Sequence, residues 1–285
     1  MNNLKIKFNK IISLIILSAL IFLCTSCSAN PILTIYFIDV GQGDSIMISA
    51  PSGKTALIDA GPKSSSKKLV DFIKSKEITE FEYVISTHPH EDHIGGMLEV
   101  LNQFKVRSII DPAYAHTTKT FENYLTKIDE LNIPFKAGRT NDIYMLGTNV
   151  SIKILWPDSV EEYVSDTNEI SLVLFLTYHE FTLLLTGDIG TKTEKSLISS
   201  GNLKNVDVLK IAHHGSKGST SEAFLKAVNP NISIICVGEN NSYNHPADIV
   251  LDRLNQVSKI YRTDLNGTII VKTDGRNLWI ETSKK

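Results

Sequence analysis

Short apolar runs separated by turn residues make up most of the chain beyond residue 31. The first run, "ILTIYFIDV" at residues 32–40, is β-branched and aromatic and predicts a buried strand. "SIMISA" and "TALIDA" follow at short spacing, after the turn sequences "GQGD" and "PSGK", and predict an antiparallel meander. Further strands are predicted at residues 81–87, 106–111, 142–147, 150–157, 171–187, 207–215, 232–238, 260–263 and 267–282.

Segments with apolar residues at helical spacing alternate with these strands. The first begins behind serines and carries Leu69, Val70, Phe72 and Ile73 among polar residues. Helices are predicted at residues 64–78, 95–104, 120–132, 221–228 and 247–257. Two sets of mostly antiparallel strands with helices outside predict an α/β (α+β) fold, built as a four-layer sandwich of helix, sheet, sheet and helix.

Polar residues recur where predicted strands end, at Asp39, Asp59, His88, Asp188 and His213. We therefore expect functional loops to gather at one rim of a rigid pair of sheets. The chain has 285 residues, of which 42% are hydrophobic, and neither an internal repeat nor a long linker divides it. These properties predict a single domain at residues 32–284.

The N-terminus has the pattern of an export signal rather than of the fold. Three lysines precede a 14-residue apolar run at residues 11–24, which is shorter than the ~20 residues that a membrane-spanning helix needs. Cys27 follows two small residues and resembles the lipidated cysteine of a bacterial lipobox, although Cys24 stands where such a box usually has leucine. We predict a signal peptide at residues 1–26, lipidated Cys27 and a membrane-anchored position on the cell surface, outside the cytoplasm. Simple secretion and an uncleaved anchor are the alternatives.

The net charge argues against one class of function, and the cysteine content indicates a buried thiol. Removing residues 1–26 takes away three of the 29 basic residues and none of the 31 acidic ones, so 26 basic residues face 31 acidic ones, a balance of about −5. This balance disfavours binding through a broad basic surface, although a local basic strip would be compatible with it. With Cys27 lipidated, Cys236 is the remaining cysteine, in an apolar run typical of a buried core thiol.

The stretch "STHPHEDHIGG" at residues 86–96 concentrates metal-binding side chains. His88 and His90 are two residues apart, so both point to the same side of an extended segment, and Asp92 and His93 follow after a turn. Imidazole and carboxylate together suit zinc, and also manganese or iron. We therefore predict a metal site here.

The motif "THPHEDH" resembles the signature of the metallo-β-lactamase superfamily. Together with "FIDVGQGDSIMI", "ALIDAG", "NEISLVL", "LLTGD", "LKIAHHGS" and "YNHP", it resembles the extracytoplasmic hydrolase domain of ComEC-type competence proteins and their stand-alone relatives. The resemblance covers residues ~32 to 282, and it implies the four-layer αββα fold and two divalent metal ions, with zinc favoured and manganese the alternative.

The resemblance also implies a ligand set. His88 and His90 would bind the first metal, Asp92 and His93 the second, and Asp188 would bridge them. Of the adjacent pair His213 and His214 we favour His214 as the ligand, and His245 as the last one. Asp92 and Asp188 are the candidate catalytic carboxylates. Asp59 is a candidate to orient a ligand histidine, with a turn role as the alternative for it and for Asp44.

One ligand histidine of the broader superfamily is missing from its usual interval. Between the first motif and Asp188 the chain offers only His179, predicted at an exposed hairpin tip, and His116, either on a surface loop or lining the cleft. The remaining candidates to contact substrate, each with a solvated loop as the alternative, are Lys210, Ser216, Lys217, Ser219 and Asn168.

The resulting hypothesis is a metal-dependent hydrolase, most simply a phosphodiesterase or nuclease. Two metals would hold a hydroxide of lowered pKa for attack on extracellular DNA or on a cell-envelope phosphodiester. Hydrolysis of a carboxylic ester or lactam is the second hypothesis, and a non-catalytic DNA-binding lipoprotein is the third. We expect a monomer, with DNA-uptake proteins as candidate partners.

Overall fold

The computed structural model describes residues 31–160 and 166–284, and residues from Ile32 onward form one compact unit. The predicted signal peptide and Cys27 lie outside the described residues. Among the helices that are described, none is both long and apolar enough to cross a bilayer.

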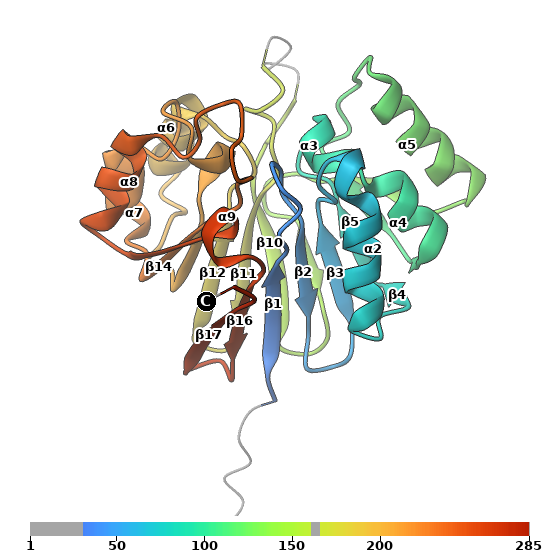
Figure 1. Cartoon of the computed structure of the whole chain (residues 1–285), viewed down its shortest axis with the longest axis horizontal. Helices are drawn as coiled ribbons and strands as arrows, with labels where there is room; N and C mark the ends of the chain where they lie inside the picture. The colour runs from blue at the N-terminus through green and yellow to red at the C-terminus, as the bar shows by residue number, and fades with distance from the viewer. Residues whose placement is uncertain (1–30, 161–165, 285) are drawn as a thin grey trace, which may run out of the picture. The chain divides into compact units, whose positions relative to one another are not determined.

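Two sheets hold most of the described strands (Figure 1). The first has the order β17 (Leu278–Thr282), β16 (Ile269–Thr273), β1 (Leu33–Phe37), β2 (Ile46–Ser49), β3 (Thr55–Ile58), β5 (Tyr83–Ile85), β7 (Ile109–Asp111), β8 (Phe135–Ala137). The second has the order β15 (Lys259–Arg262), β14 (Ile232–Ile235), β13 (Val208–Lys210), β12 (Phe181–Leu185), β11 (Val173–Tyr178), β10 (Val150–Trp156), β9 (Ile143–Met145). A short separate ladder pairs β4 (Glu80–Phe81) with β6 (Lys105–Val106).

The expectation of mostly antiparallel strands is wrong for half of each sheet. Pairing is parallel from β3 through β5 and β7 to β8, and from β12 through β13 and β14 to β15. Parallel neighbours need a crossover connection, and helices supply it. One of these helices, α6 (Thr191–Ser199), is not predicted from the sequence, because its first two turns carry no large apolar residue.

Helices cover the outer face of each sheet (Figure 1). Beside the first sheet are η1 (Lys63–Ser65), α2 (Ser66–Ser75), α3 (Glu91–Ile94), α4 (Met97–Gln103) and α5 (Lys119–Glu130). The helical segments that connect or follow the strands of the second sheet are α6, η3 (Ala212–Gly215), α7 (Glu222–Val228), α8 (Asp248–Asn255) and α9 (Thr263–Asn266).

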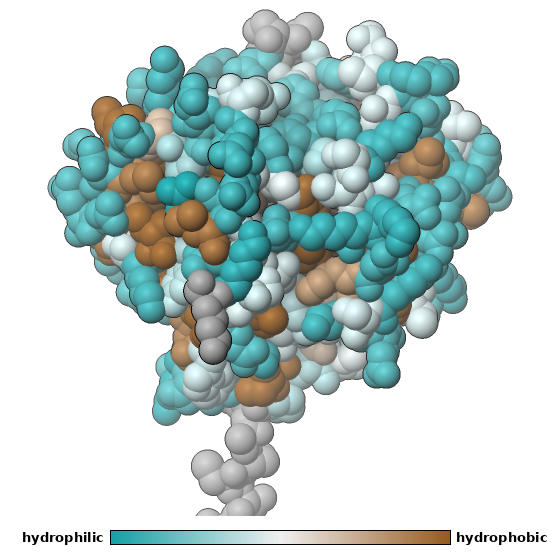
Figure 2. All heavy atoms as spheres, viewed as in Figure 1, coloured by the Kyte–Doolittle hydropathy of each residue, from teal (hydrophilic) through white to brown (hydrophobic). Residues whose placement is uncertain are grey.

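Three apolar cores separate the four layers. Ile35 and Leu174 belong to the core between the sheets, Leu57 packs with α2 and α4, and Leu184 packs with α6 and α7. Because both faces of each sheet are covered, successive residues of a strand such as β3 are all buried. The outer surface seen in Figure 2 is largely hydrophilic, with apolar residues in small groups. The four-layer sandwich predicted from the sequence is confirmed.

A buried polar group lies between β7 and α5. Asp111 accepts a hydrogen bond from the Ala113 N–H (2.7 Å), whereas its Oδ2, the Ser86 hydroxyl and the Tyr124 hydroxyl are buried without a hydrogen-bond partner. Burial raises the pKa of Asp111 to about 6. Since this value lies above the unfolded value of ~3.9, ionisation costs folding stability as the pH rises through 6.

We expect Asp111→Asn to raise the free energy of unfolding by about 2 kcal/mol at pH 8 and by nearly nothing below pH 4, because the amide cannot ionise. Urea unfolding of the variant and the wild type at both pH values measures the difference. A gain of equal size at the two pH values would contradict the buried-charge explanation.

Candidate metal centre

The parallel strands direct their carboxyl ends to one rim, and the site forms there. Asp59 follows β3, His88 follows β5, Asp188 follows β12, and Lys210 ends β13. The rim of an open sheet at the carboxyl ends of parallel strands is where such folds commonly place their ligands. Residues far apart in the sequence are thereby brought within contact distance.

The first pair of candidate ligands is His88 and His90. His88 Nε2 lies 3.1 Å from His90 Nδ1, so the two residues do point to the same side of the extended segment. Each ring has its other nitrogen engaged, His88 Nδ1 with Thr87 Oγ1 (3.1 Å) and His90 Nε2 with Thr167 Oγ1 (2.6 Å). Two nitrogens that face each other while their partners hold the rings in place are a geometry suited to sharing one cation.

The second group contains Asp92, His93, Asp188 and His214, whose ligand atoms all lie within 4.8 Å of one another. Asp188 Oδ2 is 3.3 Å from His93 Nε2 and 3.4 Å from His214 Nε2. Asp92 Oδ2 is 3.1 Å from His214 Nε2. Three of the four side chains are at most 2% exposed. The group is a ready set of nitrogen and oxygen donors around one point.

Hydrogen bonds behind the two histidines fix which nitrogen faces that point. His93 Nδ1 pairs with Asp59 Oδ2 at 2.8 Å, and His214 Nδ1 pairs with the carbonyl oxygen of Cys236 at 2.8 Å. His93 Nε2 is left buried without a hydrogen-bond partner. A carboxylate or carbonyl behind an imidazole is the usual support of a metal-ligating histidine. The residues therefore fit a divalent metal.

The electrostatics of this group also favour a cation. Burial opposes ionisation of Asp188, but the imidazoles of His214 and His93 hold the pKa of its carboxyl well below the usual range. The carboxylates in turn outweigh burial at His93 and His214, whose pKa values are raised well above the usual range. At His88, burial lowers the pKa, so the ring is neutral and able to ligate.

The segment that carries His213 and His214 is not the strand end expected from the sequence. β13 stops at Lys210, and His213, His214 and Gly215 follow with φ of 49°, 53° and 84°. Left-handed backbone at two successive histidines is unusual and is typical of strained functional sites. Gly215 is packed so closely that a Cβ would lie 2.5 Å from the Pro246 Cβ, and its carbonyl accepts from the Ala247 N–H.

This turn separates the roles of the two histidines. The His214 side chain is 1% exposed and belongs to the ligand group, whereas that of His213 is 33% exposed, with its Nε2 3.9 Å from Asp188 Oδ2. His245 lies beside both, with ring centroids 5.6 Å from His213 and 6.5 Å from His214, and its Nδ1 lacks a hydrogen-bond partner. His214 thus belongs to the donor group, and the rings of His213 and His245 lie beside it at the cavity. The choice of His214 over His213 as a ligand, and of His245 as the last ligand, stays a prediction.

A cavity of about 230 Å³ opens over the centre. Its lining residues are Gln42, His90, Asp92, Asn168, Asp188, His213, His214, Tyr243 and His245. His116 lies just outside this set, with its ring 6.1 Å from that of His90, and His179 is exposed at the turn between β11 and β12.

The other candidates to contact substrate are not placed together. Asn168 lines the cavity, and its Oδ1 is buried without a partner. Ser219 is fully buried and donates to the carbonyls of Ala212 and Ser216, so its role is structural. Ser216 and Lys217 lie in the turn outside the cavity lining. Lys210 is buried behind the centre, so the expectation that it faces substrate is wrong.

The "GQGD" turn has a larger part in the centre than the sequence indicates. The Asp44 N–H donates to the Asp92 carbonyl (3.1 Å), and the Asp44 side chain is 1% exposed beside Lys210 and His214. Gly43 has φ of 135°, and a Cβ there would overlap the Asp92 carbonyl oxygen. Because Gly43 has no side chain, its loop can contact the loop that carries Asp92. The sequence alone does not predict this contact, because it does not show which loop lies opposite Gly43.

We expect Gly43→Ala to lower the free energy of unfolding by about 2 kcal/mol or more and to weaken metal binding, because the methyl group displaces Asp92. Gly53→Ala is the matched control, since Gly53 also has positive φ (80°) but has nothing within 4 Å. Denaturant titrations and zinc affinities of both variants measure the difference. Equal effects would assign the loss to backbone strain alone.

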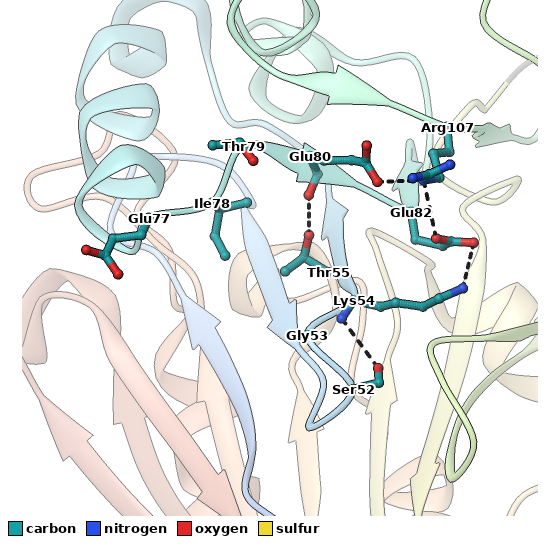
Figure 3. A pocket seen from close by; sticks show the side chains of 10 residues that line it. All are labelled: Ser52, Gly53, Lys54, Thr55, Glu77, Ile78, Thr79, Glu80, Glu82 and Arg107. Carbon is teal, nitrogen blue, oxygen red and sulfur yellow. Dashed lines mark hydrogen bonds and ion pairs between the residues drawn. The ribbon is translucent and has the colours of Figure 1, made fainter.

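A second cavity, of about 510 Å³, lies away from the histidines (Figure 3). Four of its charged lining residues pair with one another, Lys54 with Glu82 at 3.0 Å and Arg107 with Glu80 at 2.5 Å. Its lining includes none of the histidines that supply the imidazole donors of the centre.

Three bacterial proteins are similar to most of this chain. ComE operon protein 3 of Bacillus subtilis (strain 168) is 32% identical over 250 residues, which are 81% of this chain and 32% of that protein. Recombination protein 2 of Haemophilus influenzae is 29% identical over 240 residues (82% and 28%), and Competence protein ComA of Neisseria gonorrhoeae is 28% identical over 235 residues (81% and 31%). The chain spans about a third of the length of these relatives.

Solved structures share the fold at low identity. Igni18, a metallo hydrolase of Ignicoccus hospitalis KIN4/I, has a TM-score of 0.56 at 16% identity, covering 83% of this chain and 98% of that one. CmlA, a diiron β-hydroxylase of Streptomyces venezuelae, has a TM-score of 0.55 at 11% identity, covering 85% and 54%. The sequence profile of the Metallo-beta-lactamase superfamily matches residues 38–239. The resemblance inferred from the motifs is therefore confirmed: the chain belongs to the metallo-β-lactamase superfamily and has its metal-dependent hydrolase fold.

Proposed function

We propose that this chain is a phosphodiesterase that uses two divalent metals, with zinc favoured by its imidazole and carboxylate donors. The observation that carries the proposal is the convergence of two donor groups, His88 with His90 and the Asp188 group, beneath one open cavity. When bound, such metals supply Lewis acidity and a water of lowered pKa.

Different residues of the chain would bind the metals, orient the ligand histidines and contact the substrate. Asp188 Oδ2 lies within 3.4 Å of His93 Nε2 and His214 Nε2, a place from which one carboxylate oxygen would share a metal with both imidazoles. Asp59 and the Cys236 carbonyl hold those imidazoles in one orientation. Asn168 and His245 line the cavity, and we assign their side-chain N–H groups as donors to substrate oxygens.

Tyr243 supports a nucleic acid among the candidate phosphodiesters. Its ring is 65% exposed, lines the cavity and stacks on His245 with centroids 5.7 Å apart and an interplanar angle of 25°. An exposed aromatic ring beside a phosphodiester site is a surface on which an unpaired base can stack. Two of the similar proteins are named for recombination and for competence, which supports the same class of substrate.

The test compares substrates on one preparation. The full-length chain, purified in detergent and loaded with zinc or manganese, is assayed with bis-p-nitrophenyl phosphate, single-stranded DNA, a glycerol-phosphate polymer and nitrocefin. We expect phosphodiester hydrolysis that a chelator abolishes. Activity on nitrocefin alone would overturn the proposal, and DNA binding without hydrolysis under any metal would favour a non-catalytic role.

We further propose that the domain acts outside the cytoplasm, attached to the membrane through lipidated Cys27, as a monomer that works with separate DNA-uptake proteins. Membrane fractionation of cells producing the wild type and Cys27→Ser tests the anchor. A variant that stays in the membrane fraction would favour an uncleaved apolar segment instead.

A further inference from the structure

Lys210 is a buried lysine directly behind the metal centre. It ends β13, it is 1% exposed, and two segments of the chain contact its ammonium group. The contacts are an ion pair with Asp44, a hydrogen bond to the Gly187 carbonyl (2.9 Å) and an approach of 3.5 Å to Asp188 Oδ1. Burying an ammonium group costs several kcal/mol unless it is paired, so these contacts are needed to keep Lys210 charged in the folded protein.

The two oxygens of Asp188 face opposite partners. Oδ1 faces Lys210 Nζ, whereas Oδ2 faces His93 Nε2 and His214 Nε2. The Asp188 N–H donates to the Ser171 hydroxyl (3.1 Å), a bond that fixes the backbone but does not itself orient the carboxylate. Among the described residues, Lys210 is the cation that contacts this carboxylate from behind.

The counter-ion of Lys210 also reaches the centre. Asp44 Oδ2 pairs with the ammonium group, and Asp44 Oδ1 lies 3.4 Å from His214 Nδ1. The Lys210–Asp44 pair therefore touches two members of the ligand group from the side away from the cavity.

We propose that Lys210 is a positioning residue of the metal centre: it holds Asp188 with one oxygen turned away, so that the other is presented to the ligand histidines. The inference rests on the metal-binding site of the proposed function, but not on the identity of the substrate.

Two effects of removing Lys210 have opposite signs, which makes the inference testable. A positive charge close to a divalent cation repels it, so loss of the charge alone would tighten metal binding. Loss of an orienting contact weakens binding, typically by ten- to a hundredfold when it supports a metal ligand. If Lys210 positions Asp188, the second effect exceeds the first.

The experiment is a cycle of four full-length proteins: wild type, Lys210→Met, Asp44→Asn and the double variant. Zinc affinity is measured by competition with a chromophoric chelator, and ligand geometry by the visible spectrum of the cobalt-substituted protein. Unfolding of the metal-free proteins is measured alongside. The double variant leaves no unpaired buried charge, so it keeps the inference open to test even if Lys210→Met does not fold.

We expect Lys210→Met to bind zinc at least tenfold more weakly and to lose metal-free stability. In the double variant the stability returns, but the weak binding and the altered cobalt spectrum remain. Affinity that is unchanged or tighter in Lys210→Met, or restored in the double variant, would overturn the inference and leave only a structural ion pair. Wild-type protein that binds metal but cleaves no phosphodiester would refute the proposed substrate and not this role of Lys210.

Discussion

Asp188→Asn is expected to lower phosphodiester hydrolysis by at least about a thousandfold and to leave the purified protein with markedly less bound metal. The amide keeps the shape of the carboxylate but removes the charge that lies between His93 and His214. A metal site contributes several kcal/mol to transition-state stabilisation, and each 1.36 kcal/mol corresponds to a tenfold change in rate. The rate with bis-p-nitrophenyl phosphate and the metal content by elemental mass spectrometry measure the two effects.

Asp207→Asn is the matched control. Asp207 is a partly buried carboxylate that accepts hydrogen bonds from the Thr182 N–H (2.9 Å) and hydroxyl (3.1 Å). It lies beside the start of β12, whereas Asp188 follows the end of that strand. We expect it to affect stability modestly and the metal content not at all. Full activity in Asp188→Asn would refute the metal mechanism.

His214→Ala is expected to lower metal affinity and hydrolysis by about a hundredfold or more, and His213→Ala by less than about tenfold. The reason is their placement after the left-handed turn: the His214 side chain is 1% exposed with its Nε2 at the donor cluster, and that of His213 is 33% exposed at the cavity edge. Loss of a ligand acts on the metal itself, whereas loss of a lining residue acts on substrate approach.

Zinc affinity and the separate values of kcat and KM distinguish the two variants. His179→Ala, at an exposed turn far along the chain from these histidines, controls for replacement of a histidine as such. If His213→Ala loses metal and His214→Ala retains it, the assignment of the two residues is reversed.

Local periodicity is sufficient to predict part of the centre. His88 and His90 lie two apart on extended backbone, and that spacing alone places their rings on one side. The position of Asp188 and Asp59 at strand ends predicts a shared rim, and the four layers follow from apolar runs that alternate with helical segments.

The remaining features depend on contacts that sequence patterns do not carry. The turn at His213 and His214 has positive φ at non-glycine residues, and the next residue, Gly215, packs closely against Pro246 of a distant loop. The pairing of Lys210 with Asp44 joins β13 to the loop after β1, and no local rule relates them. The sequence does not predict the parallel half of each sheet. Strands that are buried on both faces are continuous apolar runs, and such a run does not indicate whether its neighbour is parallel or antiparallel.

The donors of the metal centre come from distant parts of the chain, and this separation affects when the centre forms during folding. Asp92, in α3, and His214, in η3, are 122 positions apart, yet their side chains meet at 3.1 Å. Contacts of such long sequence separation form only after the intervening loop has closed, so they complete late in folding. A chain in which the segment that carries His214 has not yet docked therefore has no assembled donor group, and no place for the metal that the group is suited to hold.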